Sequence, residues 1–259
     1  MKKLLPLLAV AFSLVSCEEI VDINLHDGNQ QVVVNAQFAT DKNKPTMTLS
    51  TTGRFTDGAG IGPASDFMVS ITDQHGNTAV LNETTAGRYR LTNYDLSTGN
   101  TYTLSATDGT KTITATSTVQ AKAVIDSVRL ELIQFSDFEF TIVHIYTVDP
   151  APEANYLRSR LNYNHQGFSN SGNVMADVLN TNGVMDMALA GGPFLQGDTL
   201  TIELWSMDEA GYQFYRTLNQ AANSDPSSTA SPFNVTSNVV GGLGLFEVYE
   251  RDEYTLIVD

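Results

Sequence analysis

The sequence is poor in basic residues. Of 259 residues, 14 are lysine or arginine and 29 are aspartate or glutamate, so the formal net charge is −15. Nucleic acids and anionic membrane surfaces bind clusters of lysine and arginine, and the longest basic run is Lys2-Lys3. The composition therefore argues against both kinds of electrostatic partner, and no nucleic acid is expected.

Cysteine is equally scarce, since Cys17 is the only one. A disulfide scaffold is excluded, because a disulfide needs two cysteines. The apolar stretch of residues 4–15 has 12 residues and is too short to cross, as a helix, a bilayer core of about 30 Å. Together with Lys2-Lys3 before it, this stretch predicts a signal peptide over residues 1–16.

The residues after this stretch are Leu14-Val15-Ser16-Cys17. They resemble the lipobox of bacterial lipoproteins, in which the signal peptide is cut before a cysteine that carries the lipid. The resemblance implies lipidation of Cys17; an ordinary secretory signal with a leftover cysteine is the alternative. Loss of two lysines leaves 12 basic and 29 acidic residues, a net charge of −17. The lipid, and not charge, would then hold the chain to the membrane.

Glu18 and Glu19 directly follow this cysteine. They resemble the export tag that some outer-membrane lipoproteins use to reach the cell surface. The resemblance implies a lipid-anchored protein of the outer membrane that faces the cell exterior, with residues 17–30 as the lipidated linker. A solvated linker on a periplasm-facing protein is the alternative.

Short alternating apolar runs follow, separated by Gly, Asn and Asp clusters that favour turns. They predict seven strands in residues 31–122, at 31–38, 46–51, 67–72, 78–81, 87–91, 101–106 and 111–119. This number of strands favours a sandwich. Gly87-Arg88-Tyr89 and the later Gly99-x-x-Tyr102-x-Leu104 resemble the rhythm of prealbumin-like and carboxypeptidase-regulatory-like sandwiches, which implies a prealbumin or Ig-like fold.

A second β-rich domain is predicted over residues 123–259, with strands at 125–133, 138–148, 155–162, 185–189, 199–205, 238–246 and 254–258. Ser206 and Glu209 have capping-box spacing, and the apolar residues after them recur as in an amphipathic helix, which predicts a helix over 207–222. The fold class is therefore mainly β, with two β-sandwich domains and one helix in the second.

The second domain carries most of the charge. Residues 123–259 hold 5 basic and 18 acidic residues, a net charge of −13. Solubility at a crowded surface explains this excess, and a cation site or a basic partner is the alternative.

Sequence patterns of catalysis are missing. None of the four histidines, at 26, 75, 144 and 165, has a second ligand-type residue at metal spacing. Glu247, Glu250, Asp252 and Glu253 cluster near the C-terminus, and two carboxylates at the right separation can hydrolyse a glycoside. A solvated hairpin with charges against edge pairing explains the cluster as well. We predict no catalytic residue, cofactor or metal, and an unrecognised hydrolase remains the alternative.

Aromatic residues are the candidate contacts for a ligand or partner. Tyr163 and Phe168 lie in the Asn/Gly/Ser-rich segment 162–173, where a loop can present rings to a ligand. Trp205 is the third candidate, and a core position around the helix is its alternative.

The order of these features resembles one family, the uncharacterised outer-membrane lipoproteins whose genes neighbour TonB-dependent receptors of the starch-utilisation type. Its most specific part is the ending Ser231-Pro232-Phe233 … Ser237-Asn238 … Gly242-Leu243-Gly244-Leu245-Phe246. The resemblance implies an accessory binding module of nutrient uptake, with a TonB-dependent receptor as partner and an unknown ligand. The alternative is a fimbrillin-like subunit that assembles by strand exchange after cleavage at Arg54.

Overall fold

The computed structural model describes residues 30–53, 61–135, 138–148, 154–164, 172–177, 183–224 and 234–259. These residues form a mainly β structure with a single helix, which confirms the predicted class. Cys17, Arg54 and Phe168 lie outside the described residues, as do the predicted signal peptide and nearly all of the linker. Within the described part, no helix combines the length and the apolar character needed to cross a membrane.

The first group of strands closely follows the predicted ranges. It comprises β1 (Val32–Ala39), β2 (Thr46–Thr51), β3 (Gly62–Pro63), β4 (Met68–Asp73), β5 (Thr78–Thr85), β6 (Arg88–Arg90), β7 (Thr101–Thr107) and β8 (Thr112–Thr118). Alternate residues of these strands point into one apolar core, which includes Phe38, Tyr89 and Tyr102. The period-2 pattern predicts this core because successive side chains of a strand face opposite sides.

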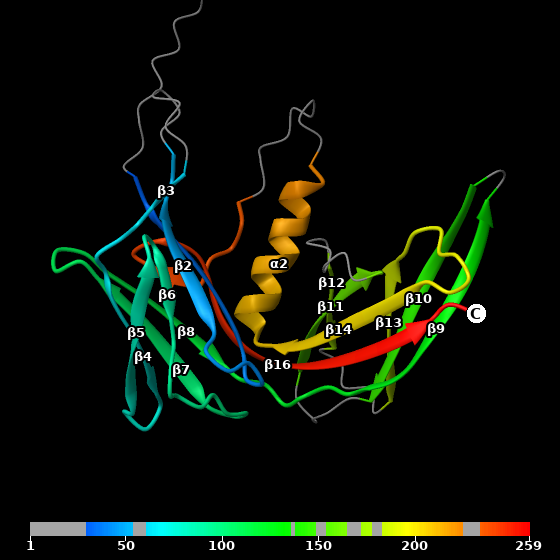
Figure 1. Ribbon diagram of the computed structural model, residues 1–259, viewed down its shortest axis with the longest axis horizontal. Coiled ribbons are helices and arrows are strands. Elements are labelled where there is room, and N and C mark those ends of the chain that lie inside the picture. The colour runs from blue at the N-terminus through cyan, green and yellow to red at the C-terminus, as the bar shows by residue number, and fades with distance from the viewer. Residues whose placement is uncertain are drawn as a thin grey trace, which may run out of the picture.

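The second group of strands is β9 (Ile125–Phe135), β10 (Phe138–Val148), β11 (Asn155–Tyr163), β12 (Asn173–Asp177), β13 (Val184–Ala190) and β14 (Thr199–Met207). Strands β13, β10 and β9 form a small antiparallel sheet. Its inner face contributes Val143, Ile145 and Met187 to a second core, together with Leu157 and Ile202 from β11 and β14. The β strands thus surround two apolar cores, with the second group to the right in Figure 1.

One long strand joins the two groups. Strand β16 (Leu243–Ile257) pairs in parallel with β1 over residues 243–249 and antiparallel with β14 over residues 250–257. A two-residue strand, β15 (Val239–Val240), pairs with β8. The chain end therefore forms one 15-residue strand inside a 13-stranded curled sheet, where the sequence predicts two separate strands. Residues 246 and 248 lie in the first core.

The helix α2 (Glu209–Ala222) ends at the predicted residue but begins two residues later than predicted. Its N-cap is Asp208, whose Oδ1 accepts a hydrogen bond from the Gly211 N–H at 2.9 Å. The prediction of a Ser206 cap is wrong. Ser206 still belongs to β14, and its Oγ accepts a hydrogen bond from the backbone N–H of Ala123 at 2.8 Å. The aspartate takes the cap because an Asp oxygen serves this role as well as a Ser oxygen.

Candidate functional site

A groove lies beside α2, between residues of β1 on one side and residues of β11 on the other. We call it the α2 groove. Its volume is about 450 Å³, within the range of ligand pockets in proteins. It is lined by Val33, Val34, Asn35 and Gln37 from β1, Arg158 and Arg160 from β11, Phe214, Tyr215 and Leu218 from α2, and Gly244 and Leu245 from β16.

Strand periodicity explains how these side chains reach the groove. In β1, Val34 and Phe38 are buried in the first core, so the alternate residues Asn35 and Gln37 face the helix side. The Gln37 amide nitrogen donates to the Asn35 side-chain oxygen at 2.9 Å. These two amides therefore give the groove a polar wall on the β1 side.

Two arginines and an aromatic cluster form the opposite wall. The guanidinium carbon of Arg158 lies 4.0 Å from the ring centroid of Tyr215 and 4.8 Å from that of Trp205. Arg160 lies 5.0 Å from the Trp205 centroid, and Trp205 stacks on Tyr249 at 4.0 Å. Cation–π contacts of this kind stabilise a partly desolvated charge. Burial lowers the pKa of Arg158, which is only 5% exposed.

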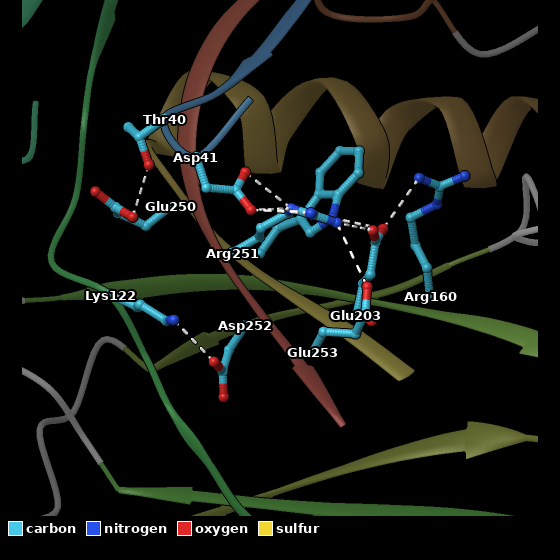
Figure 2. Close-up of polar contacts among 10 residues, drawn as sticks. Thr40, Asp41, Lys122, Arg160, Glu203, Glu250, Arg251, Asp252 and Glu253 are labelled. Atoms are coloured by element: carbon cyan, nitrogen blue, oxygen red, sulfur yellow. Dashed lines mark hydrogen bonds and ion pairs between the residues drawn. The ribbon is translucent and has the colours of Figure 1, made fainter. Parts of the chain in front are cut away.

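A chain of charges crosses the sheet below this wall (Figure 2). The buried Glu203 carboxylate accepts from Arg251 and the Trp205 Nε1–H, and forms an ion pair with Arg160 at 3.4 Å. Arg251 extends this network to Asp41, because its Nε–H donates to both carboxylate oxygens of Asp41 at 2.9 Å. Because a buried carboxylate needs partners, this network holds Arg160 and Trp205 in place. No sequence motif points to Glu203, Arg158 or Arg160.

The Asp41→Asn variant tests the outer end of this charge network. The hydrogen bond from Arg251 lowers the pKa of Asp41, so Asp41 stabilises the fold above its usual pKa and the effect is lost as the pH falls through the folded-state value. Asp41 is half exposed, so we expect the variant to lose only about 1 kcal/mol of unfolding free energy at pH 7. Urea titrations at pH 7 and pH 3 measure this, and an equal loss at both pH values would contradict it.

The C-terminal carboxylates are not a solvated hairpin, and that prediction is wrong. They lie on β16, and three of them have their own partners (Figure 2). Glu250 accepts from Thr40 at 2.8 Å, Asp252 pairs with Lys122 at 2.8 Å, and Glu253 lies 3.6 Å from Arg251. A central strand tolerates these charges because neighbouring elements satisfy them. Glu250 and Asp252 therefore fasten β16 to other segments, whereas Glu253 pairs within the strand.

Glu247 differs from its neighbours on β16. It is fully buried beneath α2, close to the backbone at Gly211, and neither carboxyl oxygen has a hydrogen-bond partner among the described residues. Burial raises the pKa of Glu247 to about 8; Asp208 raises it further, and Arg158 opposes the shift. The carboxyl group is therefore mainly protonated at neutral pH.

The structure does not bring together Tyr163 and Trp205, the two candidate contacts that lie within the described residues. Trp205 is 2% exposed and lies in the aromatic cluster under α2. Tyr163, at the end of β11, packs against the second core. Its hydroxyl donates to Asp198 at 2.9 Å, and its ring contacts Phe194. Trp205 does not line the groove itself but contacts three residues that do, Arg158, Arg160 and Tyr215.

His144 has carboxylate partners that its sequence position did not reveal. Its Nε2 lies 2.8 Å from Glu131, and its Nδ1 lies 3.0 Å from Asp186. Strand pairing brings β9, β10 and β13 side by side, which spacing along the chain does not show. Across the described ranges, no group of three His, Cys, Asp or Glu residues is arranged to hold a metal ion.

A family model described as a domain of unknown function (DUF4249) matches residues 18–255. The fold also has a weak similarity to the adhesin InvE of Yersinia pseudotuberculosis, with a TM-score of 0.20 and 12% identity. That match covers 70% of this chain and 57% of the adhesin chain, and a similarity this weak carries no functional argument. No curated protein matches the sequence.

Proposed function

We propose a function for this chain, which belongs to the DUF4249 family: it is a non-catalytic binding module of a TonB-dependent nutrient-uptake receptor. In this proposal the lipid on Cys17 anchors the chain to the outer membrane, with the folded part facing the cell exterior. The proposal combines the lipobox resemblance with the site beside α2.

The α2 groove is the observation that carries the binding role. It joins apolar surface from Leu218 and Leu245 to the amides of Asn35 and Gln37 and to the arginine wall. Such a combination of an apolar lining and few polar groups is typical of ligand sites. The charge network below the wall fixes the arginine side of the groove before a ligand arrives, which reduces the entropy lost on binding.

Affinity capture from detergent-solubilised outer membranes tests the proposal. We expect the tagged wild-type lipoprotein to recover a TonB-dependent receptor, identified by mass spectrometry. The Cys17→Ala variant removes the acceptor of the lipid, so we expect it to take up no labelled fatty acid and to leave the membrane fraction. Absence of any such receptor from the wild-type capture would refute the partner, and membrane-bound, unlabelled wild-type protein would refute the anchor.

A second measurement addresses the groove itself. Trp205 is the only tryptophan, and it contacts both arginines that line the groove. Its fluorescence therefore reports on ligands that move these arginines. A panel of short oligopeptides and oligosaccharides serves as the probe set, and a saturable change in emission with one class would identify the ligand chemistry.

A further inference from the structure

The β9–β10 hairpin carries apolar side chains on both of its faces near its tip. Leu132 is 58% exposed on the inner side, and Phe140 is 39% exposed on the outer side. They lie on neighbouring strands, because Phe140 pairs with Ile133. Figure 1 shows strands β9 and β10 on the opposite side of the molecule from β4 and β5. Leu132 belongs to the strand at the edge of the small sheet, so its exposed side chain is placed to meet a strand that adds there.

Strand β9 is also a free edge. It ends the order β13-β10-β9 of the small sheet and pairs with no other strand of the described residues. One register shift lies near its start, between Tyr146 and Thr147 of β10, and regular pairing then continues from Ser127 to Phe135. An unpaired edge of this length is a template for one further strand.

Polar contacts make the hairpin rigid beneath its tip. His144 joins Glu131 on β9 to Asp186 on β13 through contacts of 2.8 and 3.0 Å. Gln134 donates to Glu139 across the two strands at 3.4 Å. A prearranged edge loses little conformational entropy when a partner binds, so it suits docking better than a loop.

Charge identifies the partner's chemistry. Residues 125–148 hold four acidic residues and one basic residue, a net charge of −3 with histidine neutral. A second copy would bring the same negative charge to the same edge, and an anionic lipid surface would repel it. A basic, apolar segment complements both the charge and the exposed side chains.

We propose that the free edge of β9 is the docking site for an extended, apolar and basic segment of a partner protein, which adds to the small sheet as a fourth strand. This inference rests on the proposed function, and the partner it implies is the receptor. On the edge strand itself, Leu132 contacts apolar side chains of the segment and Glu131 attracts its basic groups, while Glu139 and Phe140 lie one strand further in, on β10, and border the site.

Capture with two lysine variants tests this docking site. Leu132→Lys puts a positive charge on the edge, and Val80→Lys makes the same change on β5, where Val80 is 56% exposed. Both full-length lipoproteins are captured from solubilised outer membranes as above. We expect Leu132→Lys to recover at least tenfold less receptor, and Val80→Lys to differ from wild type by less than twofold, with unchanged circular dichroism for both.

The outcomes separate the docking site from the proposed function. Equal receptor recovery by all three proteins would overturn the docking site and leave the function standing, whereas a wild-type capture without receptor would overturn both. A photo-crosslinker at position 140 identifies the occupant. Crosslinks to a receptor segment rich in Lys, Arg and apolar residues support the proposal, and crosslinks only to a second copy or to lipid overturn it.

Discussion

Replacement of Glu247 by glutamine stabilises the protein at alkaline pH. Glutamine has the shape of the neutral carboxyl group but cannot ionise. The pKa of Glu247 is about 8 in the folded protein, against 4.5 for an ordinary glutamate, so between these values the folded chain holds a proton that the unfolded chain has lost. The wild-type protein therefore loses stability as the pH rises through this window, by about 1.4 kcal/mol per pH unit.

The wild-type protein loses at most roughly 5 kcal/mol of unfolding free energy in this way once the pH exceeds the folded-state pKa of Glu247. Below about pH 4.5 the wild-type and Glu247→Gln proteins have similar unfolding free energies, because Glu247 is then protonated in both states. Urea unfolding from pH 4 to pH 9 measures the difference. Glu253→Gln is the matched control, since it changes a half-exposed carboxylate of the same strand. Parallel pH profiles for the Glu247→Gln and control proteins would contradict a buried, protonated Glu247.

Replacement of Gly244 by alanine disrupts the pairing of β16 with β1. Gly244 has a φ of +106°, which side-chain-bearing residues rarely adopt, and a Cβ there would overlap with the Val34 carbonyl oxygen. The obstacle is backbone of the paired strand, since Val34 lies opposite Gly244 in the register. We expect a loss of about 3 kcal/mol or more of unfolding free energy, because strain and lost pairing add.

Gly192→Ala is the control for this change. A Cβ at Gly192 meets nothing within 4 Å, so the same substitution there is expected to shift the urea midpoint very little. Equal midpoints for the two variants would show that the close approach of β16 and β1 does not constrain position 244. A large loss of unfolding free energy in Gly244→Ala alone would explain why the Gly242-Leu243-Gly244-Leu245-Phe246 segment has a glycine at position 244.

Local pattern was sufficient for most of the secondary structure. The predicted strands at 46–51 and 138–148 have the same bounds as β2 and β10, because alternation and flanking turn residues are local properties. The helix end at Ala222 was predicted, whereas its start was misplaced, because Ser206 and Asp208 are both suitable caps. Strand β14 extends to Met207, so Ser206 lies within the strand and Asp208 is left as the cap.

The site was not predictable in the same way. Asp41 and Arg251 are separated by most of the sequence, and they meet because β16 pairs with β1 in parallel. The charges of residues 247–253 suggest a solvated turn until their partners are known. A single sequence contains no signal for Arg158 and Arg160 as groove residues, apart from their alternate positions in one strand.

By itself, the sequence determined that this chain is mainly β with one amphipathic helix, because side-chain periodicity and turn residues act over a few positions. The tertiary structure alone decided that β16 joins the two groups of strands and that, among the described residues, Glu247 is buried without a hydrogen-bond partner and β9 is a free edge. These features depend on which strands become neighbours. That choice is made by long-range pairing and burial, which the local pattern of residues does not contain.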